Sequence, residues 1–447
     1  MNSLAKGFIL VLVILLFASV VYTSPAVAAQ NTPKWATQLV DPRGEGGQIV
    51  FDSKDNPHIL YSILSDWDLR IGQNLLNYAV WNGQNWTAQY VTITNGATLT
   101  LDSNDTPQIV NKANDSFAFI AWDGTKWNTE KTVPVPEGLG DRWSGLNYDS
   151  SGNLRLVYPY GEYYDSDRQN VSLKYALWNG SNWSIQTIEN KLANYSDNYA
   201  PKSVVYDSNG YPHILYQEST TYSFYSPNAI SYNHMAHFTE VHIKYAVWTG
   251  SNWNIETVAV NATAYNLILN SMGEPSVCFV QEKSTYNPDY DGWRTEESLR
   301  YAHFNGADWE FSNIYSNESY DVLIKAHLRL NNAGKPQVCY YIRNYGSESG
   351  DLMFATLSDS SWTIQRIGSV AFNDIAFDSK GNIHITYTSV IGSFNAAPRY
   401  GDLTYASLEE SLETPSPDYT ILFGAVFATF IIAIVIFIFI TIHRKRS

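Results

Sequence analysis

Three tryptophans stand outside the repeated positions of this sequence, and each has an arginine close by. The pairs are Trp67 with Arg70, Trp143 with Arg142, and Trp293 with Arg294. An indole offers a flat surface for a sugar ring, and a guanidinium offers a planar fork for carboxylates or sulfates. These six residues are the predicted ligand-binding residues, with an acidic glycan as ligand. Alternatively, each Trp covers the end of a structural unit and each Arg pairs with a nearby carboxylate, since surface ion pairs are common and weak.

Histidine and acidic residues gather in other parts of the chain. His234, His237 and His242 lie close together, and histidine is a frequent zinc ligand. Their spacing fits no closed set of zinc ligands, and a solvated, tyrosine-rich loop explains it as well. Residues 289–292 (Asp-Tyr-Asp-Gly) and 165–167 (Asp-Ser-Asp) resemble fragments of calcium loops without the further carboxylates of a full site. We therefore predict no metal site and no cofactor, with calcium (Ca) as the one ion that these fragments leave open.

Linear motifs of catalysis are missing from the sequence. It contains no nucleophile elbow, helical zinc motif, phosphate-binding loop or distinctive carboxylate pair. No residue is therefore assigned as catalytic, and no nucleotide cofactor is expected. Because an active site can be assembled from distant loops, an enzyme stays open as the alternative.

The elements that must position these residues come from an internal repeat. Seven copies of a turn, in its fullest form Asp-x-x-Gly-x-Pro-His-Ile-x-Tyr, start at Asp52, Asp102, Asp149, Asp207, Asn270, Asn331 and Asp378. A second landmark is a tight hairpin, often Asn-Gly, that is followed by Trp86, Trp127, Trp183, Trp253, Trp309 or Trp362. Each copy predicts four short antiparallel strands, which is the size of a propeller blade.

The ends of the repeat predict how the ring closes. Residues 35–40 have the pattern of a fourth strand without its first three, and the last copy stops after its third strand at Leu408. The predicted fold class is therefore all-β, a seven-bladed β-propeller in which the N-terminal strand completes the last blade. This arrangement removes the open edge strands that would invite aggregation.

Residues at the repeated positions are expected to be structural. The turn aspartates should accept backbone hydrogen bonds as Asx turns. His58, His213 and His384 share one repeat position and therefore one packing role. Cys278 and Cys339 occupy one register of successive copies, which is too far apart for a disulfide because its Cα atoms must lie within about 7 Å. We predict that both cysteines are free and buried.

One face of the propeller is expected to vary between blades. The Asp turns and hairpins share one face, and the second-to-third and fourth-to-first connections share the other. The longest of these predicted loops are residues 62–74, 134–143, 159–171, 190–201, 218–241 and 281–297. Binding sites are usually built from variable loops on a rigid scaffold, and the six candidate residues fall in or beside these loops.

The repeat resembles the sialidase-like, Asp-box family of β-propellers over residues 31–408. The resemblance is architectural, since residues 207–212 (Asp-Ser-Asn-Gly-Tyr-Pro) share with an Asp box only an acidic turn with glycine three residues later. The chain has no Arg-Ile-Pro motif, so the catalytic residues of the sialidases have no counterpart here. Polysaccharide lyases of similar architecture use Tyr or His for proton transfer and Arg to neutralise a uronate. This likeness offers Tyr163, Tyr164, Tyr232 and His234 for such roles.

Both ends of the chain have the pattern of targeting segments. Residues 1–29 show the charge, apolar core and small residues of a signal peptide. The uncharged run 421–442 is long enough, at about 1.5 Å per residue, to cross roughly 30 Å of hydrocarbon, and the basic residues 443–447 are expected in the cytoplasm. Residues 30–410 then form the ectodomain and 411–420 a stalk with Pro and Ser. The prediction is a single-pass protein of the cell membrane with its propeller outside.

Composition limits the partners. The formal net charge is −15 and aromatic residues make up 15% of the chain, which excludes a disordered protein and argues against a nucleic-acid binder. The leading hypothesis is an outward-facing binding module for glycans or cell-surface proteins. The alternative is a glycan-active enzyme, either a polysaccharide lyase or a sialidase-like glycoside hydrolase, that uses the variable face.

Overall fold

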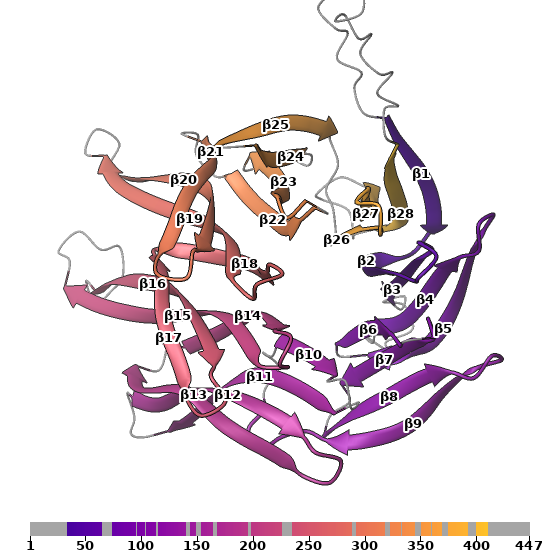
Figure 1. Cartoon of the computed structure of the whole chain (residues 1–447), viewed down its shortest axis with the longest axis horizontal. Helices are drawn as coiled ribbons and strands as arrows, with labels where there is room; N and C mark the ends of the chain where they lie inside the picture. Colours follow the sequence, from indigo (N-terminus) through magenta and orange to yellow (C-terminus); the bar gives the residue numbers. More distant parts are fainter. Residues whose placement is uncertain are drawn as a thin grey trace, which may run out of the picture. The chain divides into compact units, whose positions relative to one another are not determined.

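The computed structural model contains seven four-stranded antiparallel sheets around a central axis, which together form a seven-bladed β-propeller (Figure 1). The propeller is one compact unit, Ala36–Ser407. The structure describes residues 34–64, 74–94, 96–102, 104–112, 115–139, 144–148, 153–163, 168–194, 198–225, 235–287, 292–317, 322–331, 333–344, 350–358, 360–368, 374–391 and 399–409. The predicted signal peptide (1–29), stalk (411–420), membrane segment (421–442) and tail (443–447) lie outside these ranges. Within them, no helix has the length and apolar character needed to cross a membrane.

Blades 1 to 6 each consist of four consecutive strands, from β2–β5 to β22–β25, and blade 7 combines β26–β28 with β1. The strands are β1 (Lys34–Asp41), β2 (Glu45–Phe51), β3 (Pro57–Leu64), β4 (Asn74–Trp81), β5 (Trp86–Thr94), β6 (Ala97–Leu101), β7 (Pro107–Lys112), β8 (Ser116–Trp122), β9 (Trp127–Pro134), β10 (Ser144–Tyr148), β11 (Leu154–Tyr163), β12 (Arg168–Trp178), β13 (Trp183–Asn194), β14 (Asn198–Tyr206), β15 (Pro212–Tyr225), β16 (Met235–Trp248), β17 (Trp253–Val260), β18 (Ala262–Leu269), β19 (Pro275–Asn287), β20 (Gly292–Phe304), β21 (Trp309–Asn317), β22 (Val322–Leu330), β23 (Pro336–Asn344), β24 (Asp351–Ser358), β25 (Ser361–Gly368), β26 (Asp374–Phe377), β27 (Ile383–Ile391) and β28 (Arg399–Glu409).

Ring closure follows the predicted scheme. In blade 7 the strand order is β1-β28-β27-β26, so the N-terminal strand is the outer strand of the C-terminal blade. The number of blades and their closure were both encoded in the repeat, and both predictions are confirmed.

The repeated turns are held by their first side chain, as predicted. Asp52 Oδ1 accepts hydrogen bonds from the backbone N–H groups of Lys54 (2.9 Å) and Asn56 (2.7 Å). The same pair of bonds recurs at Asp102, Asp207, Asn270, Asn331 and Asp378. These residues fix the connection between the first and second strands, so their role is structural.

The tryptophan after each hairpin joins neighbouring blades. Trp127 Nε1 donates to Gln89 Oε1 of blade 1 at 3.1 Å, and its ring packs edge-on against Tyr78, with 5.0 Å between the ring centroids. Equivalent Nε1 bonds run from Trp86 to Gln38, Trp253 to Gln186, Trp309 to Glu256 and Trp362 to Ser312, each acceptor being three residues after the preceding repeat tryptophan. The tryptophans at repeat positions are therefore interblade anchors.

Polar side chains on the inner strands also join blades. Asn266 on β18 exchanges two hydrogen bonds with the backbone of Leu328 on β22, at 2.8 and 2.9 Å. Gln48 on β2 makes the same exchange with Leu99 on β6, at 3.2 and 2.8 Å. An amide suits this position because it can both donate and accept.

Buried residues at the second strand explain the remaining repeat positions. His58 Nδ1 lies 2.5 Å from the Tyr78 hydroxyl, and the corresponding distances are 2.5 Å from His213 to Tyr245 and 2.6 Å from His384 to Tyr405. Cys278 and Cys339 are buried free thiols. Burial raises the pKa of both thiols, so they are inert apolar fillers. The predicted shared role of the histidines and the predicted state of the cysteines are confirmed.

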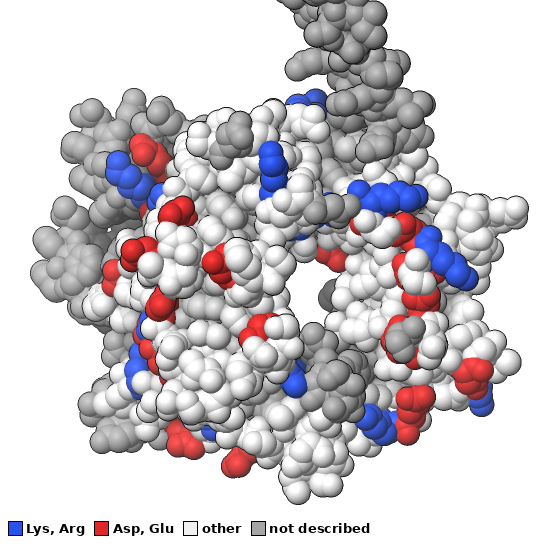
Figure 2. Space-filling view, in the orientation of Figure 1, with Lys and Arg blue, Asp and Glu red and all other residues white. Residues whose placement is uncertain are grey.

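Charge is distributed without a dominant sign on the face that Figure 2 shows. Lys and Arg side chains are interspersed with Asp and Glu around a central opening. Any electrostatic recognition by this face must therefore come from local groups rather than from a broad field.

Candidate functional site

The structure describes two of the six predicted ligand-binding residues. Trp67, Arg70, Arg142 and Trp143 lie outside the described residues. Trp293 and Arg294 are described as part of β20, where Trp293 is paired with Tyr286 and Arg294 with Thr285 of β19. Both residues therefore lie on a strand within the predicted loop 281–297, and their role in ligand binding stays a prediction.

Three of the longest predicted loops are also largely strand rather than loop. Residues 159–171, 218–241 and 281–297 are largely strand, because β11 and β12, β15 and β16, and β19 and β20 continue as paired hairpins. The sequence 240–244 (Glu-Val-His-Ile-Lys) alternates polar and apolar residues, which is the period of a strand. We call the paired segments 216–225 of β15 and 235–244 of β16 arm 4.

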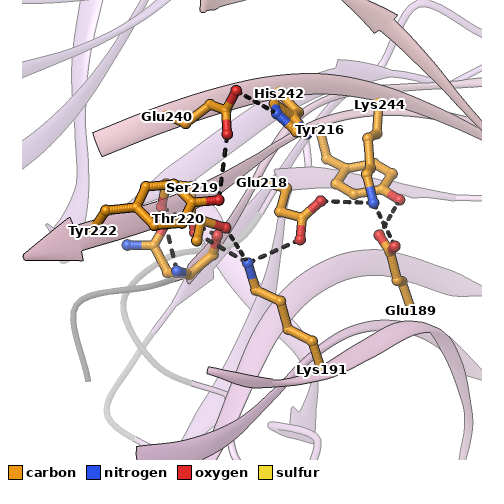
Figure 3. Close-up of polar contacts among 11 residues, drawn as sticks. Glu189, Lys191, Tyr216, Glu218, Ser219, Thr220, Tyr222, Glu240, His242 and Lys244 are labelled. Atoms are coloured by element: carbon orange, nitrogen blue, oxygen red, sulfur yellow. Dashed lines mark hydrogen bonds and ion pairs between the residues drawn. The ribbon is translucent and has the colours of Figure 1, made fainter. Parts of the chain in front are cut away.

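Polar side chains collect on one face of arm 4. Cross-strand register places Tyr216 opposite Lys244, Glu218 opposite His242, and Thr220 opposite Glu240. Tyr222 continues the same face one pair further out. Because side chains alternate along a strand, these residues share one side of the hairpin. We call them, with Glu189 and Lys191 of β13, the arm 4 cluster (Figure 3).

The inner half of the cluster is a chain of opposite charges between blades 3 and 4. Lys244 Nζ lies 2.5 Å from Glu189 Oε1 and 2.6 Å from Glu218 Oε2, so it bridges two carboxylates. Lys191 Nζ lies 2.8 Å from the other oxygen of Glu218, and the Tyr216 hydroxyl donates to Glu189 at 2.6 Å. Two ammonium groups thus compensate two carboxylates.

The pKa values of the inner half follow from burial and pairing. Burial alone would raise the pKa of Glu218, but hydrogen bonds and charge from Lys191 and Lys244 lower it below the usual value. Burial would lower the pKa of Lys244, and its two carboxylate partners raise it instead. Burial, followed by the hydrogen bond to Glu189, raises the pKa of Tyr216. Glu218 is therefore ionised and Tyr216 is neutral at physiological pH.

The outer half of the cluster is more open to solvent. Glu240 lies between two groups, with 3.4 Å from its Oε1 to His242 Nε2 and 3.4 Å from its Oε2 to the Tyr222 hydroxyl. About a third of the His242 and Glu240 side chains is exposed, and Tyr222 is 50% exposed. At 3.4 Å these are loose contacts, which free enzymes commonly show before substrate binds. A tyrosine, a carboxylate and a histidine in this arrangement can accept, relay and donate protons.

Other candidates from the sequence receive little support. Tyr164, Tyr232 and His234 lie outside the described residues, Tyr163 ends β11, and His237 lies on β16. Of the three clustered histidines, His242 is the one with a described side chain, and its neighbour is Glu240 rather than another histidine. The described side chains contain no group of three His, Cys, Asp or Glu that could hold a metal ion. Residues 165–167 and 289–291 of the calcium-loop fragments are not described.

Comparisons with family models and with curated proteins find no relative of this chain. No protein-family model matches the chain, and no curated protein has a matching sequence. The assignment to the sialidase-like, Asp-box family therefore stays a prediction.

Solved structures do match. One, reported as a new family of polysaccharide lyase, PL25-ulvan lyase, has a TM-score of 0.51 and 10% sequence identity, and the match covers 85% of this chain and 94% of that chain. The polysaccharide lyase Uly1 has a TM-score of 0.45, 10% identity and coverage of 86% and 94%. An alpha-L-arabinanase from Penicillium chrysogenum has a TM-score of 0.38, 10% identity and coverage of 84% and 98%. At this level of identity, the chain shares the propeller fold of a polysaccharide lyase.

Proposed function

We propose that the protein is a glycan-active enzyme, and specifically a polysaccharide lyase that works at the outer half of the arm 4 cluster. The observation that carries the proposal is the placement of Tyr222, Glu240 and His242 side by side on one hairpin, with a Tyr222–Glu240 hydrogen bond of 3.4 Å and 3.4 Å between Glu240 and His242. Similarity of the propeller to a polysaccharide lyase, at a TM-score of 0.51, supports the same reading. Together they favour the enzyme over the binding module that the sequence suggested first.

The chemistry of a lyase assigns a role to each of the three residues. A base removes the proton on the carbon next to the uronate carboxylate, the bond from the next carbon to the glycosidic oxygen breaks, a carbon–carbon double bond forms, and the leaving oxygen takes up a proton. His242 is the base: when Nε2, which lies 3.4 Å from Glu240, carries the ring proton, Nδ1 can accept the substrate proton. Tyr222 is the acid that protonates the leaving oxygen, and Glu240 orients both groups.

A glycoside hydrolase fits the cluster less well. Hydrolysis by a carboxyl pair requires one protonated carboxyl group with a raised pKa. Glu189 and Glu218 are the close carboxylates here, but both contact Lys244, and the pKa of Glu218 is lowered. A hydrolase would therefore lack its acid at this place.

Location is part of the proposal. The apolar run 421–442 would anchor the propeller outside the cell, and residues 1–29 would direct export. The substrate would then be a polymer of the cell surface or surroundings, and the membrane would be the fixed partner of the chain.

Cleavage assays on the full chain test the proposal. The purified protein is incubated with ulvan, other uronate polysaccharides and neutral arabinan, and products are read by mass and by the ultraviolet absorbance of the new conjugated double bond. His242→Asn and Tyr222→Phe should each lower kcat by about 10²-fold or more. Tyr90→Phe is the matched control, because Tyr90 is 54% exposed on β5, a strand of blade 1.

Each alternative has its own signature in the same assay. Retention of a glycan without new products would support the binding module and reject the lyase. Shortened products without a double bond would indicate a hydrolase instead.

A further inference from the structure

We propose that Lys191 is the residue of this site that binds an anionic group of the substrate. Its ammonium group gives up its contact with Glu218 and pairs instead with a carboxylate or sulfate on the glycan. This inference rests on the proposed function for its location and adds the residue that selects acidic substrates. Lys191 comes from blade 3, whereas the proposed acid and base come from blade 4 (Figure 3).

The contacts of Lys191 make it the exchangeable cation of the cluster. Its Nζ lies 2.8 Å from Glu218 and donates to two neutral acceptors, the Ser219 carbonyl at 3.2 Å and the Thr220 hydroxyl at 3.0 Å. Three contacts use all the protons of an ammonium group. A ligand anion can therefore bind Lys191 only by replacing one of these contacts.

Glu218 can release Lys191 without becoming an uncompensated charge. Its second oxygen stays 2.6 Å from Lys244, which is also held by Glu189. Removing Lys244 instead would leave Glu189 without any ammonium partner, because the carboxylate in contact with Lys191 is that of Glu218, and an unpaired carboxylate is costly at this degree of burial. Of the two lysines, Lys191 is therefore the one that can change partner.

The position of Lys191 connects this exchange to the proposed chemistry. Thr220, which contacts Lys191, is the cross-strand partner of Glu240, and Glu218 is the cross-strand partner of His242. Directly opposite residues of an antiparallel pair have Cβ atoms about 5 Å apart, which is roughly the width of a sugar ring. An anionic group held by Lys191 would thus place its own sugar beside His242 and Tyr222.

Binding measurements on the full chain test Lys191 separately from catalysis. Ulvan and a carboxyl-reduced, desulfated derivative are compared as ligands at two salt concentrations for wild type, Lys191→Gln and Lys191→Arg. Lys191→Gln should weaken binding of ulvan by roughly tenfold or more, as expected for a lost charge-assisted contact. It should leave the neutral derivative unchanged and reduce the salt dependence. Lys191→Arg should retain most of the preference for ulvan.

Lys283→Gln is the matched control. Lys283 lies on the hairpin of blade 5, where its side chain is 74% exposed and 3.9 Å from Glu296. Thermal unfolding of every variant shows whether the fold is retained. If Lys191→Gln does not fold, Lys191→Arg still tests the role of Lys191, through the salt dependence of ulvan binding and the preference for ulvan over its neutral derivative.

The outcomes separate this inference from the proposed function. Charge-selective binding that Lys191→Gln abolishes, in a wild type that cleaves nothing, would uphold Lys191 and reject the lyase. Cleavage of ulvan that Lys191→Gln leaves unchanged would uphold the lyase and reject Lys191. The inference would also be overturned if Lys191→Gln weakened the binding of ulvan and of the neutral derivative equally, or if the wild type did not bind ulvan.

Discussion

Asp374 accepts a hydrogen bond from the backbone N–H of Ile49 at 3.0 Å, across the junction where blade 7 meets blade 1. Asn266 and Gln48 make the corresponding bonds between other blades, but as amides they donate as well as accept. Burial raises the pKa of Asp374 despite hydrogen bonds from the backbone of Ile49 and Ile375. The junction therefore carries a carboxyl group where an amide would fit better.

Asp374→Asn should stabilise the protein at pH 7 by about 1–2 kcal/mol, because it removes a buried charge and adds a donor. A folded-state pKa above the unfolded value of about 3.9 means that the wild-type side chain favours folding at low pH and loses that contribution as the pH rises. The gain should therefore grow from pH 4 to pH 7. Denaturant unfolding at both pH values measures it, and an equal or larger gain at pH 4 would contradict the assignment.

Lys244→Met should destabilise the protein by about 3 kcal/mol, since it strips both Glu189 and Glu218 of a partly buried partner. Lys191→Gln should cost less than about 1 kcal/mol, because Glu218 keeps Lys244. Denaturant midpoints compare the two variants. Equal losses would show that Lys191 is as fixed as Lys244. Adding Glu189→Gln to Lys244→Met should restore part of the loss by removing an unpaired charge.

Trp127→Phe should cost about 1 kcal/mol, the value of the hydrogen bond to Gln89, while the edge-on contact with Tyr78 remains. Trp127→Ala should cost about 3 kcal/mol or more, because the interblade packing is lost as well. A double-mutant cycle with Gln89→Leu isolates the bond. If the two single effects simply add, the bond does not contribute to stability.

Acid should destabilise the propeller through its buried histidines. Burial lowers the pKa of His58, His213 and His384, although Asp52 lies 3.7 Å from His58 and Asp378 lies 3.5 Å from His384. The unfolded chain then takes up protons first, so the free energy of unfolding should fall as the pH drops below about 6.5.

Gln108 and Gln337 occupy the same ladder position in blades 2 and 6, opposite Thr100 and Arg329. A triple variant with His58→Gln, His213→Gln and His384→Gln should therefore fold and show a flatter dependence of stability on pH between 7.5 and 5.5. A slope equal to that of wild type would assign the acid sensitivity to other groups.

The propeller could be predicted because each blade is marked by residues that lie close together in the sequence. The Asp turns and the hairpin tryptophans recur in successive copies, and the incomplete first and last copies indicate the split last blade. The structure has all of these features. The arm 4 cluster was not predicted. Residues 218–241 are predicted as a loop, although the alternation of Glu240, His242 and Lys244 already has the period of a strand.

The partners within the cluster could not be read from the sequence in any case. Glu189 and Lys244 are 55 residues apart, and they meet where β13, the fourth strand of blade 3, contacts blade 4. Such contacts depend on how two blades pack, which a single repeat does not encode. Of the six predicted ligand-binding residues, Trp293 and Arg294 lie in the described part of the chain, both on β20.

The pairing of β1 with β28 also sets an order of events during synthesis. β1 leaves the ribosome before the other described strands, and its partner is the last of them, so six blades can form while β1 still has an exposed edge. Ring completion then becomes a single late step for the whole domain. A chain terminated anywhere before Arg399 would keep that edge permanently, which makes truncated products candidates for aggregation rather than for partial activity.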